Sequence, residues 1–329
     1  MTIAVICGGV GAARFLRALA AVWPASDTVG VVNTGDDTVL HGLSISPDLD
    51  TITYTLAGAI DPERGWGLRD ESWRAMGALA RFEAVRPTAS AAAPTWFNLG
   101  DQDLATHFYR TARLAEGATL TQATDEIRRA WGLEQRLLPM SDDPVTTRIT
   151  LAEDDRPGTE IAFQEYFVRL RHGVPVSAIR FAGAETAVPS PHALDALSTS
   201  RAVVIAPSNP LVSIAPIRSL SGVDSALAAR RDTVVAISPI VGGAALKGPA
   251  DRMLEELGHE SSVVGVARLY APIARTLVID PVDAPLADAV RAEGLDVVIT
   301  PSIMSTPEIG AELARRTLAA AGITVSDRA

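Results

Sequence analysis

The sequence predicts an α/β fold: a doubly wound, mostly parallel, Rossmann-like sheet with a small helical insertion. Short apolar runs recur along the chain and end in loops that contain glycine, proline or serine, which is typical of strands buried on both faces of a parallel sheet. Segments with helical spacing separate these runs, in the order of β–α–β units with right-handed crossovers. We expect the sheet domain over residues 1–100 and 139–329, and the insertion over residues 101–138.

The first unit begins with the apolar run Ile3–Cys7, which ends in a glycine-rich turn. Apolar residues then recur at helical spacing until Pro24, which ends the helix. The next apolar run, residues 29–32, ends in Asn33. We therefore expect a strand, a helix and a second parallel strand, with both strands ending at the same edge of the sheet.

The middle of the chain has helical spacing and little strand pattern. Leu104, Phe108 and Tyr109 recur at helical spacing, and residues 120–131 form a second helical segment with Thr121 as its expected N-cap. These two helices make up the predicted insertion.

The second half returns to short apolar runs, at residues 203–206, 234–237, 277–279 and 297–300, with a helix expected over 285–294. Each run ends in a loop with proline or serine. Ligands of open parallel sheets bind beyond the carboxyl ends of the strands. These loops and the glycine-rich turn are therefore where we expect the binding site.

The composition argues against nucleic-acid and membrane partners. The 329 residues carry 29 basic and 39 acidic side chains, a net charge of −10, whereas a nucleic-acid-binding domain needs a basic face. The longest uncharged apolar stretch, residues 202–217, is interrupted by prolines and is shorter than the roughly 20 residues of a membrane span. The single cysteine, Cys7, and the lack of a basic segment before the first apolar run predict a cytoplasmic protein without a signal peptide.

The turn after the first strand predicts an anion site. Gly8, Gly9 and Gly11 let the backbone approach a phosphate at the start of the helix; a tight turn without a ligand is the alternative. The dinucleotide fingerprint is incomplete, because Arg14 stands where a third glycine would allow close packing of helix and strand. Nicotinamide binding, which Asp36 after the second strand would suit, is therefore the weaker interpretation.

Polar side chains at other strand ends extend the candidate site. Asp36 is the first choice as a Mg²⁺ ligand, because its strand directs it towards the glycine turn and carboxylate oxygens beside phosphates suit this ion. Ser208 and Asn209 follow a later strand and suit a phosphate or a base, although turn residues need no ligand. The histidines show no paired spacing and cysteine occurs once, so we do not expect a zinc site.

Seven segments, in order along most of the chain, match one known family. They are GGVGAARFL (8–16), VVNTGDD (31–37), HGLSISPDLDT (41–51), WFNLGDQDLATH (96–107), LLPMSDDPVTT (137–147), IAPSNPLVSIAPI (205–217) and SPIVGGAALKGPA (238–250). Together they resemble the 2-phospho-L-lactate transferase family of coenzyme F-420 biosynthesis.

The resemblance implies a reaction and the residues that perform it. The family binds a guanosine diphosphate ester of a phosphorylated three-carbon acid and the deazaflavin alcohol Fo. The terminal ribityl hydroxyl of Fo attacks the phosphate that carries the acid, and GMP leaves. The resemblance implies Mg²⁺ as the cofactor, Asp36 and Asp50 as metal ligands and catalytic residues, Asp50 also at the Fo site, and a homodimer. The residues implied to face the guanosine diphosphate are Gly8, Gly9, Gly11, Asn33, Ser208 and Asn209.

The sequence allows alternatives for the donor, for the function and for the role of Asp50. The acid of the donor is lactate, enolpyruvate or glycerate, because Val39, Ser46 and Gln102, near the expected pocket, differ from residues usual in the family. The alternative function is a non-catalytic, nucleotide-sugar-binding regulator of the same fold, although such proteins lack the PDLDT and SDDP segments. The alternative role for Asp50 is the N-cap of a helix over residues 51–56.

Overall fold

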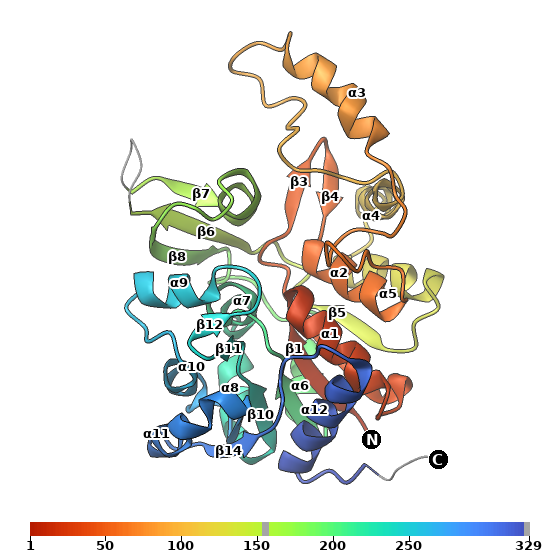
Figure 1. The fold of residues 1–329 in the computed structure, drawn as a ribbon. Helices are drawn as coiled ribbons and strands as arrows, with labels where there is room; N and C mark the ends of the chain where they lie inside the picture. The colour runs from red at the N-terminus through yellow and green to blue at the C-terminus, as the bar shows by residue number, and fades with distance from the viewer. Residues whose placement is uncertain (153–157, 326–329) are drawn as a thin grey trace.

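The computed structural model describes residues 1–152 and 158–325 of the chain (Figure 1). Its centre is a seven-stranded, wholly parallel sheet in the order β14-β13-β10-β9-β1-β2-β5. The predicted α/β fold is confirmed. The strands are β1 (Ile3–Cys7), β2 (Thr28–Val32), β5 (Arg136–Pro139), β9 (Ala202–Ile205), β10 (Val234–Ile237), β13 (Thr276–Ile279) and β14 (Asp296–Ile299).

Successive side chains of each strand point to opposite faces of the sheet. Because these side chains are apolar on both faces, helices cover both. In β1, Ala4 and Ile6 belong to one hydrophobic core, and Ile3, Val5 and Cys7 belong to the other. The first core is completed mainly by α6 (Ala193–Thr199), α7 (Ala215–Arg218), α8 (Val223–Ala229), α10 (Val263–Tyr270) and α11 (Ala287–Ala292). The second is completed mainly by α1 (Gly9–Ala20), α2 (Pro47–Leu56) and α12 (Pro307–Ala320).

The strand order places a topological switch point between β1 and β9. From β1 the chain proceeds to β2 and β5 on one side, whereas β9 is followed by β10, β13 and β14 on the other. The loops that leave the carboxyl ends of β1 and β9 therefore diverge, and such a point is where open α/β sheets bind ligands.

Smaller elements lie beyond the carboxyl edge of the sheet, in the upper half of Figure 1. An antiparallel sheet in the order β7-β6-β8 lies on one side, and the β3–β4 hairpin, α3, α4 and α5 lie on the other. These elements are β3 (Thr38–Leu40), β4 (Leu43–Ile45), α3 (Arg74–Glu83), α4 (Asp103–Ala115), α5 (Leu120–Ala130), β6 (Thr146–Leu151), β7 (Glu160–Ala162) and β8 (Val176–Ala182). Below the β7-β6-β8 sheet in Figure 1 are the hairpin of β11 (Ile240–Val241) and β12 (Ala244–Ala245), and α9 (Ala250–Glu256).

One local prediction was wrong, and another was right only in part. The N-cap of α5 is Thr119 and not Thr121, because Thr119 and Gln122 form a reciprocal capping box. The segment predicted as a helix over 285–294 starts as a 3-10 helix, Pro281–Leu286, and becomes α-helical only in α11.

The predicted insertion contains α4 and α5, and β5 at its end belongs to the main sheet. The division of the chain into domains stays a prediction. Among the described helices, none is both long and apolar enough to cross a membrane.

Candidate active site

A cavity of about 440 Å³ lies at the switch point, beyond the carboxyl ends of β1 and β9. The loops after these strands, the start of α2 and aromatic side chains from more distant segments line it. The structure brings every predicted site residue to this cavity: Gly8, Gly9, Gly11, Asn33, Asp36, Asp50, Ser208 and Asn209. Their chemical roles stay predictions.

The glycine turn is fixed by close packing. A Cβ atom on Gly11 would lie 2.3 Å from the carbonyl oxygen of Pro207, and one on Gly8 would lie 2.5 Å from Oδ2 of Asp48. Gly9 has a φ of +73°, which favours glycine. The turn therefore needs glycine for its own geometry, whether or not a phosphate binds there.

The side chains of Ser208 and Asn209 are engaged in local structure. The Ser208 hydroxyl donates to the carbonyl oxygen of Gly8 at 2.8 Å and so ties the loop after β9 to the loop after β1. Oδ1 of Asn209 accepts from the N–H of Leu211 and caps the π-helix Pro210–Ile214. Both residues shape the switch point and line the cavity.

Asp48, which the sequence analysis did not select, is bound directly to the glycine turn. Its Oδ1 accepts from the N–H of Gly9 at 2.7 Å, and its Oδ2 accepts from the Asn33 amide at 2.9 Å. The carboxylate therefore accepts the hydrogen bond of the first free backbone N–H of α1. Burial raises the pKa of Asp48 to about 6, although the hydrogen bonds from Asn33 and Gly9 lower it.

Asp36 is the second buried carboxylate of this group. Its Oδ1 accepts from the same Asn33 amide at 3.2 Å, and its Oδ2 accepts from Nε2 of Gln164 at 3.1 Å. Burial, followed by the charges of Asp48 and Asp37, raises the pKa of Asp36 well above its usual range.

The Asp36–Asp48 group fits a divalent cation. Asn33 bridges the two carboxylates, and within the described part of the chain no arginine or lysine forms an ion pair with either. Neighbouring buried carboxylates without a cation repel each other, which favours their protonated forms. Mg²⁺ is held by one or two carboxylates together with oxygens of its substrate, so this donor set suits it.

Asp50 has a cationic partner. The guanidinium of Arg110 donates to both of its oxygens, with Nη1 3.1 Å from Oδ2 and Nη2 bonded to Oδ1. The side chain of Arg110 is only 1% exposed and that of Asp50 is 7% exposed. The predicted alternative role of Asp50 as an N-cap is wrong, because α2 begins at Pro47 and its N-cap is Ser46.

A buried polar network continues from Asp50 into α4. Nδ1 of His107 lies 3.7 Å from the Asp50 carboxylate, and its Nε2 lies 3.3 Å from Asp103. The Tyr54 hydroxyl donates to Asp103 at 2.6 Å. Asp50, Asp103 and His107 offer ligand atoms within 4.8 Å of one another. They suit Mg²⁺ less well than the Asp36–Asp48 group, because Mg²⁺ takes oxygen ligands and Arg110 already neutralises Asp50.

Only some of the site residues that were not predicted could have been recognised from the sequence. Asp103, His107 and Arg110 are spaced i, i+4 and i+7 within a stretch predicted to be helical, which places them on one face. Asp48 lies in the quoted PDLDT segment, but its direction depends on where α2 begins. Gln164 lies outside every predicted element, so no sequence signal marked it.

Comparison with known proteins assigns the chain to a family. Residues 3–305 match the family described as 2-phospho-L-lactate transferase CofD. The chain belongs to this family. The predicted resemblance is confirmed, and the protein is a CofD-family transferase of coenzyme F-420 biosynthesis. This result favours the transferase over the non-catalytic regulator and over a nicotinamide enzyme.

Relatives within the CofD family match over almost the whole chain. The phosphoenolpyruvate transferase of Kitasatospora aureofaciens is 41% identical over 324 residues, 98% of each chain. That of Streptomyces griseus is 41% identical over 319 residues, 97% of this chain and 98% of the other. That of Nocardia farcinica is 38% identical over 323 residues, 98% and 95% of the two chains.

A solved structure supports the fold alone. It is a UPF0052-family protein from Bacillus halodurans, with a TM-score of 0.59 and 13% identity over 96% of this chain and 98% of that one.

Proposed function

We propose that this protein transfers the phosphoenolpyruvyl group of a guanosine diphosphate ester to the terminal ribityl hydroxyl of Fo, with release of GMP. The names of relatives at 38–41% identity support enolpyruvate over lactate or glycerate as the acid. The observation that carries the proposal is a single cavity in which a helix start, two buried carboxylates and aromatic walls meet, and no arginine or lysine of the described chain forms an ion pair with these carboxylates.

The diphosphate of the donor would lie beside the glycine turn. The start of α1 presents backbone N–H groups and the positive end of the helix dipole to the cavity. The Gly9 N–H already binds Asp48, so the phosphates would approach a carboxylate of like charge. A divalent cation held by these carboxylates would offset that repulsion.

Asp36 and Asp48 are the residues that would hold Mg²⁺. When bound, the ion neutralises charge on the transferring group and helps to orient it. Asp50, which the sequence analysis paired with Asp36 as a ligand, has both oxygens on Arg110. We therefore assign Asp50 its other predicted role, at the hydroxyl of Fo.

Asp50 would accept the proton of the attacking hydroxyl. A carboxylate offers about four lone-pair sites, so Asp50 can bind Arg110 and still accept a further hydrogen bond on the cavity side. As the new bond forms between the ribityl oxygen and phosphorus, the bond from phosphorus to the GMP oxygen breaks and the hydroxyl proton moves to Asp50. Arg110 fixes the direction of the carboxylate throughout.

The aromatic walls would hold the deazaflavin ring. Side chains from four separate segments line the cavity with planar, apolar surface that suits stacking on a flat ring system. They are Tyr54, Trp66, Trp96, Phe97, Phe163 and Phe167. The same cavity thus offers polar groups for the phosphates and an apolar surface for the ring.

Fluorescence titration tests the proposal at the level of binding, because Fo is fluorescent. Added protein should change Fo fluorescence with a saturable, one-site dependence. Fluorescence that stays unchanged at every protein concentration would contradict the proposal. GDP binding, measured by calorimetry on the same preparation, tests the donor side separately.

A further inference from the structure

The chain contains 29 lysine and arginine residues, and Lys247 is its only lysine. Lys247 lies between β12 and α9 and lines the cavity. The hairpin that precedes it is anchored, because the N–H of Gly242 donates to the carboxylate of Asp283 at 3.0 and 3.1 Å and Ser261 donates to the carbonyl of Gly243. This anchoring holds the backbone ahead of Lys247 at the cavity edge.

The ammonium of Lys247 lies close to the start of α1. The position of a Cβ on Gly65 is 3.1 Å from Nζ of Lys247 and 3.4 Å from Cγ1 of Val10. Val10 is in the first turn of α1, directly after Gly9. Nζ and the glycine turn therefore flank the same small region of the cavity.

This ammonium has no carboxylate partner in the described structure, although Asp36, Asp48 and Asp50 line the same cavity. Those carboxylates are bound by amides or by Arg110. An ammonium is a compact charge with three donors on a flexible stem, and it suits phosphate oxygens. Beside a helix start it adds to the positive potential there.

We propose that Lys247 binds the diphosphate of the guanosine nucleotide beside the start of α1. This inference rests on the proposed function and names the residue that neutralises the donor independently of Mg²⁺. Lys247 is then a binding residue for the donor and, after transfer, for the GMP that leaves.

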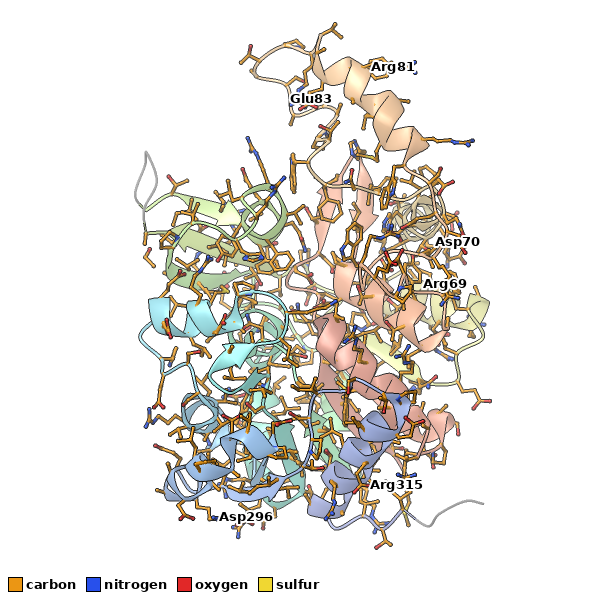
Figure 2. All side chains as sticks on the ribbon, in the orientation of Figure 1. Arg69, Asp70, Arg81, Glu83, Asp296 and Arg315 are labelled. Carbon is orange, nitrogen blue, oxygen red and sulfur yellow. The ribbon has the colours of Figure 1, made fainter. Side chains whose placement is uncertain are left out.

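Calorimetric titration of the full chain with GDP and with guanosine, in the presence of Mg²⁺, tests this role. Lys247→Met should weaken GDP binding by about 10- to 100-fold, the size of one charged hydrogen bond, and should leave guanosine binding unchanged. Lys247→Arg should keep GDP affinity within about threefold, because it keeps the charge. Figure 2 shows Arg81 on α3, away from the main sheet; it is exposed and does not line the cavity, so Arg81→Met is the matched control and should change neither affinity.

The outcomes separate this inference from the proposed function. GDP affinity that is equal in Lys247→Met and the parent overturns the role of Lys247 but leaves the proposed function intact. A parent that binds GDP no better than guanosine contradicts the proposed function itself.

A second measurement does not depend on a variant that folds. Acetylation by an amine-selective reagent can reach only the amino terminus and Lys247, and peptide mapping separates the two. GDP should slow acetylation of Lys247 and not of the amino terminus, whereas guanosine should slow neither. Equal rates at Lys247 with GDP and with guanosine would overturn the inference.

Discussion

Asp50→Asn separates the proposed catalytic role of Asp50 from its structural role. Asparagine keeps the size of the side chain but removes the charge that Arg110 neutralises. Because Arg110 is only 1% exposed, its guanidinium would become a buried, unpaired charge. Breaking one side of such a pair costs about 3–5 kcal/mol of unfolding free energy. Loss of a proton acceptor lowers kcat by a factor on the order of 10²–10⁴.

A double variant distinguishes the two effects. In Asp50→Asn with Arg110→Gln, neither member of the pair is charged, so the penalty of an unpaired buried charge disappears. We expect most of the lost stability to return. Turnover should stay low, because the acceptor for the hydroxyl proton is still missing.

Two assays on the parent and both variants distinguish a catalytic role of Asp50 from a purely structural one. Urea denaturation gives the unfolding free energies, and steady-state kinetics with Fo, the enolpyruvyl donor and excess Mg²⁺ gives kcat. A catalytic role for Asp50 is contradicted if folded Asp50→Asn turns over within a few-fold of the parent, or if the double variant recovers activity together with stability. Asp50 would then serve only to pair with Arg110.

Three further predictions concern the turn, the metal and the buried carboxylates. Gly11→Ala should lower the unfolding free energy by about 1–3 kcal/mol, because its Cβ meets the Pro207 carbonyl. In the control Gly77→Ala in α3, the new Cβ has nothing within 4 Å, so the unfolding free energy should rise by about 0.5–1 kcal/mol. Equal effects of the two substitutions in urea denaturation would contradict the packing role of Gly11. Excess chelator should abolish turnover and leave the protein folded, as measured by circular dichroism, and full activity under chelation would exclude the metal role. The folded pKa of Asp48, about 6, lies above that of an unfolded aspartate, so protonation stabilises the fold at low pH and this contribution is lost as pH rises through about 6. Without metal, the unfolding free energy of the parent relative to Asp48→Asn should fall by about 2–3 kcal/mol between pH 4 and pH 7.5; parallel pH curves argue against a raised pKa.

The position of the site could be predicted from the sequence, because it depends only on where the parallel strands end. Parallel strands that end at one edge bring Gly8, Asp36 and Ser208 together even though they are far apart in the chain. The apolar runs were strong enough to identify these strands and their direction. The placement of the strand-end residues at one cavity follows from that alone.

Contacts between elements could not be predicted in the same way. Asp48 and Asp50 are two residues apart, so in α2 they point in different directions, and the first residue of α2 decides which of them reaches the glycine turn. The pairing of Asp50 with Arg110 depends on how α4 packs beside α2. The β7-β6-β8 sheet has short antiparallel strands, and Phe163 and Gln164, which follow β7 and line the cavity, lie in a segment without a clear periodic signal.

Mass spectrometry of the product is the direct test of phosphoenolpyruvyl transfer to Fo. The protein is mixed with Fo, Mg²⁺ and the guanosine diphosphate esters of enolpyruvate, lactate and glycerate in equal amounts. We expect a product with the mass of Fo plus a phosphoenolpyruvyl group, together with an equal amount of GMP. A product that carries mainly lactate or glycerate would contradict the proposed donor, and unchanged Fo with no GMP would contradict the proposed reaction.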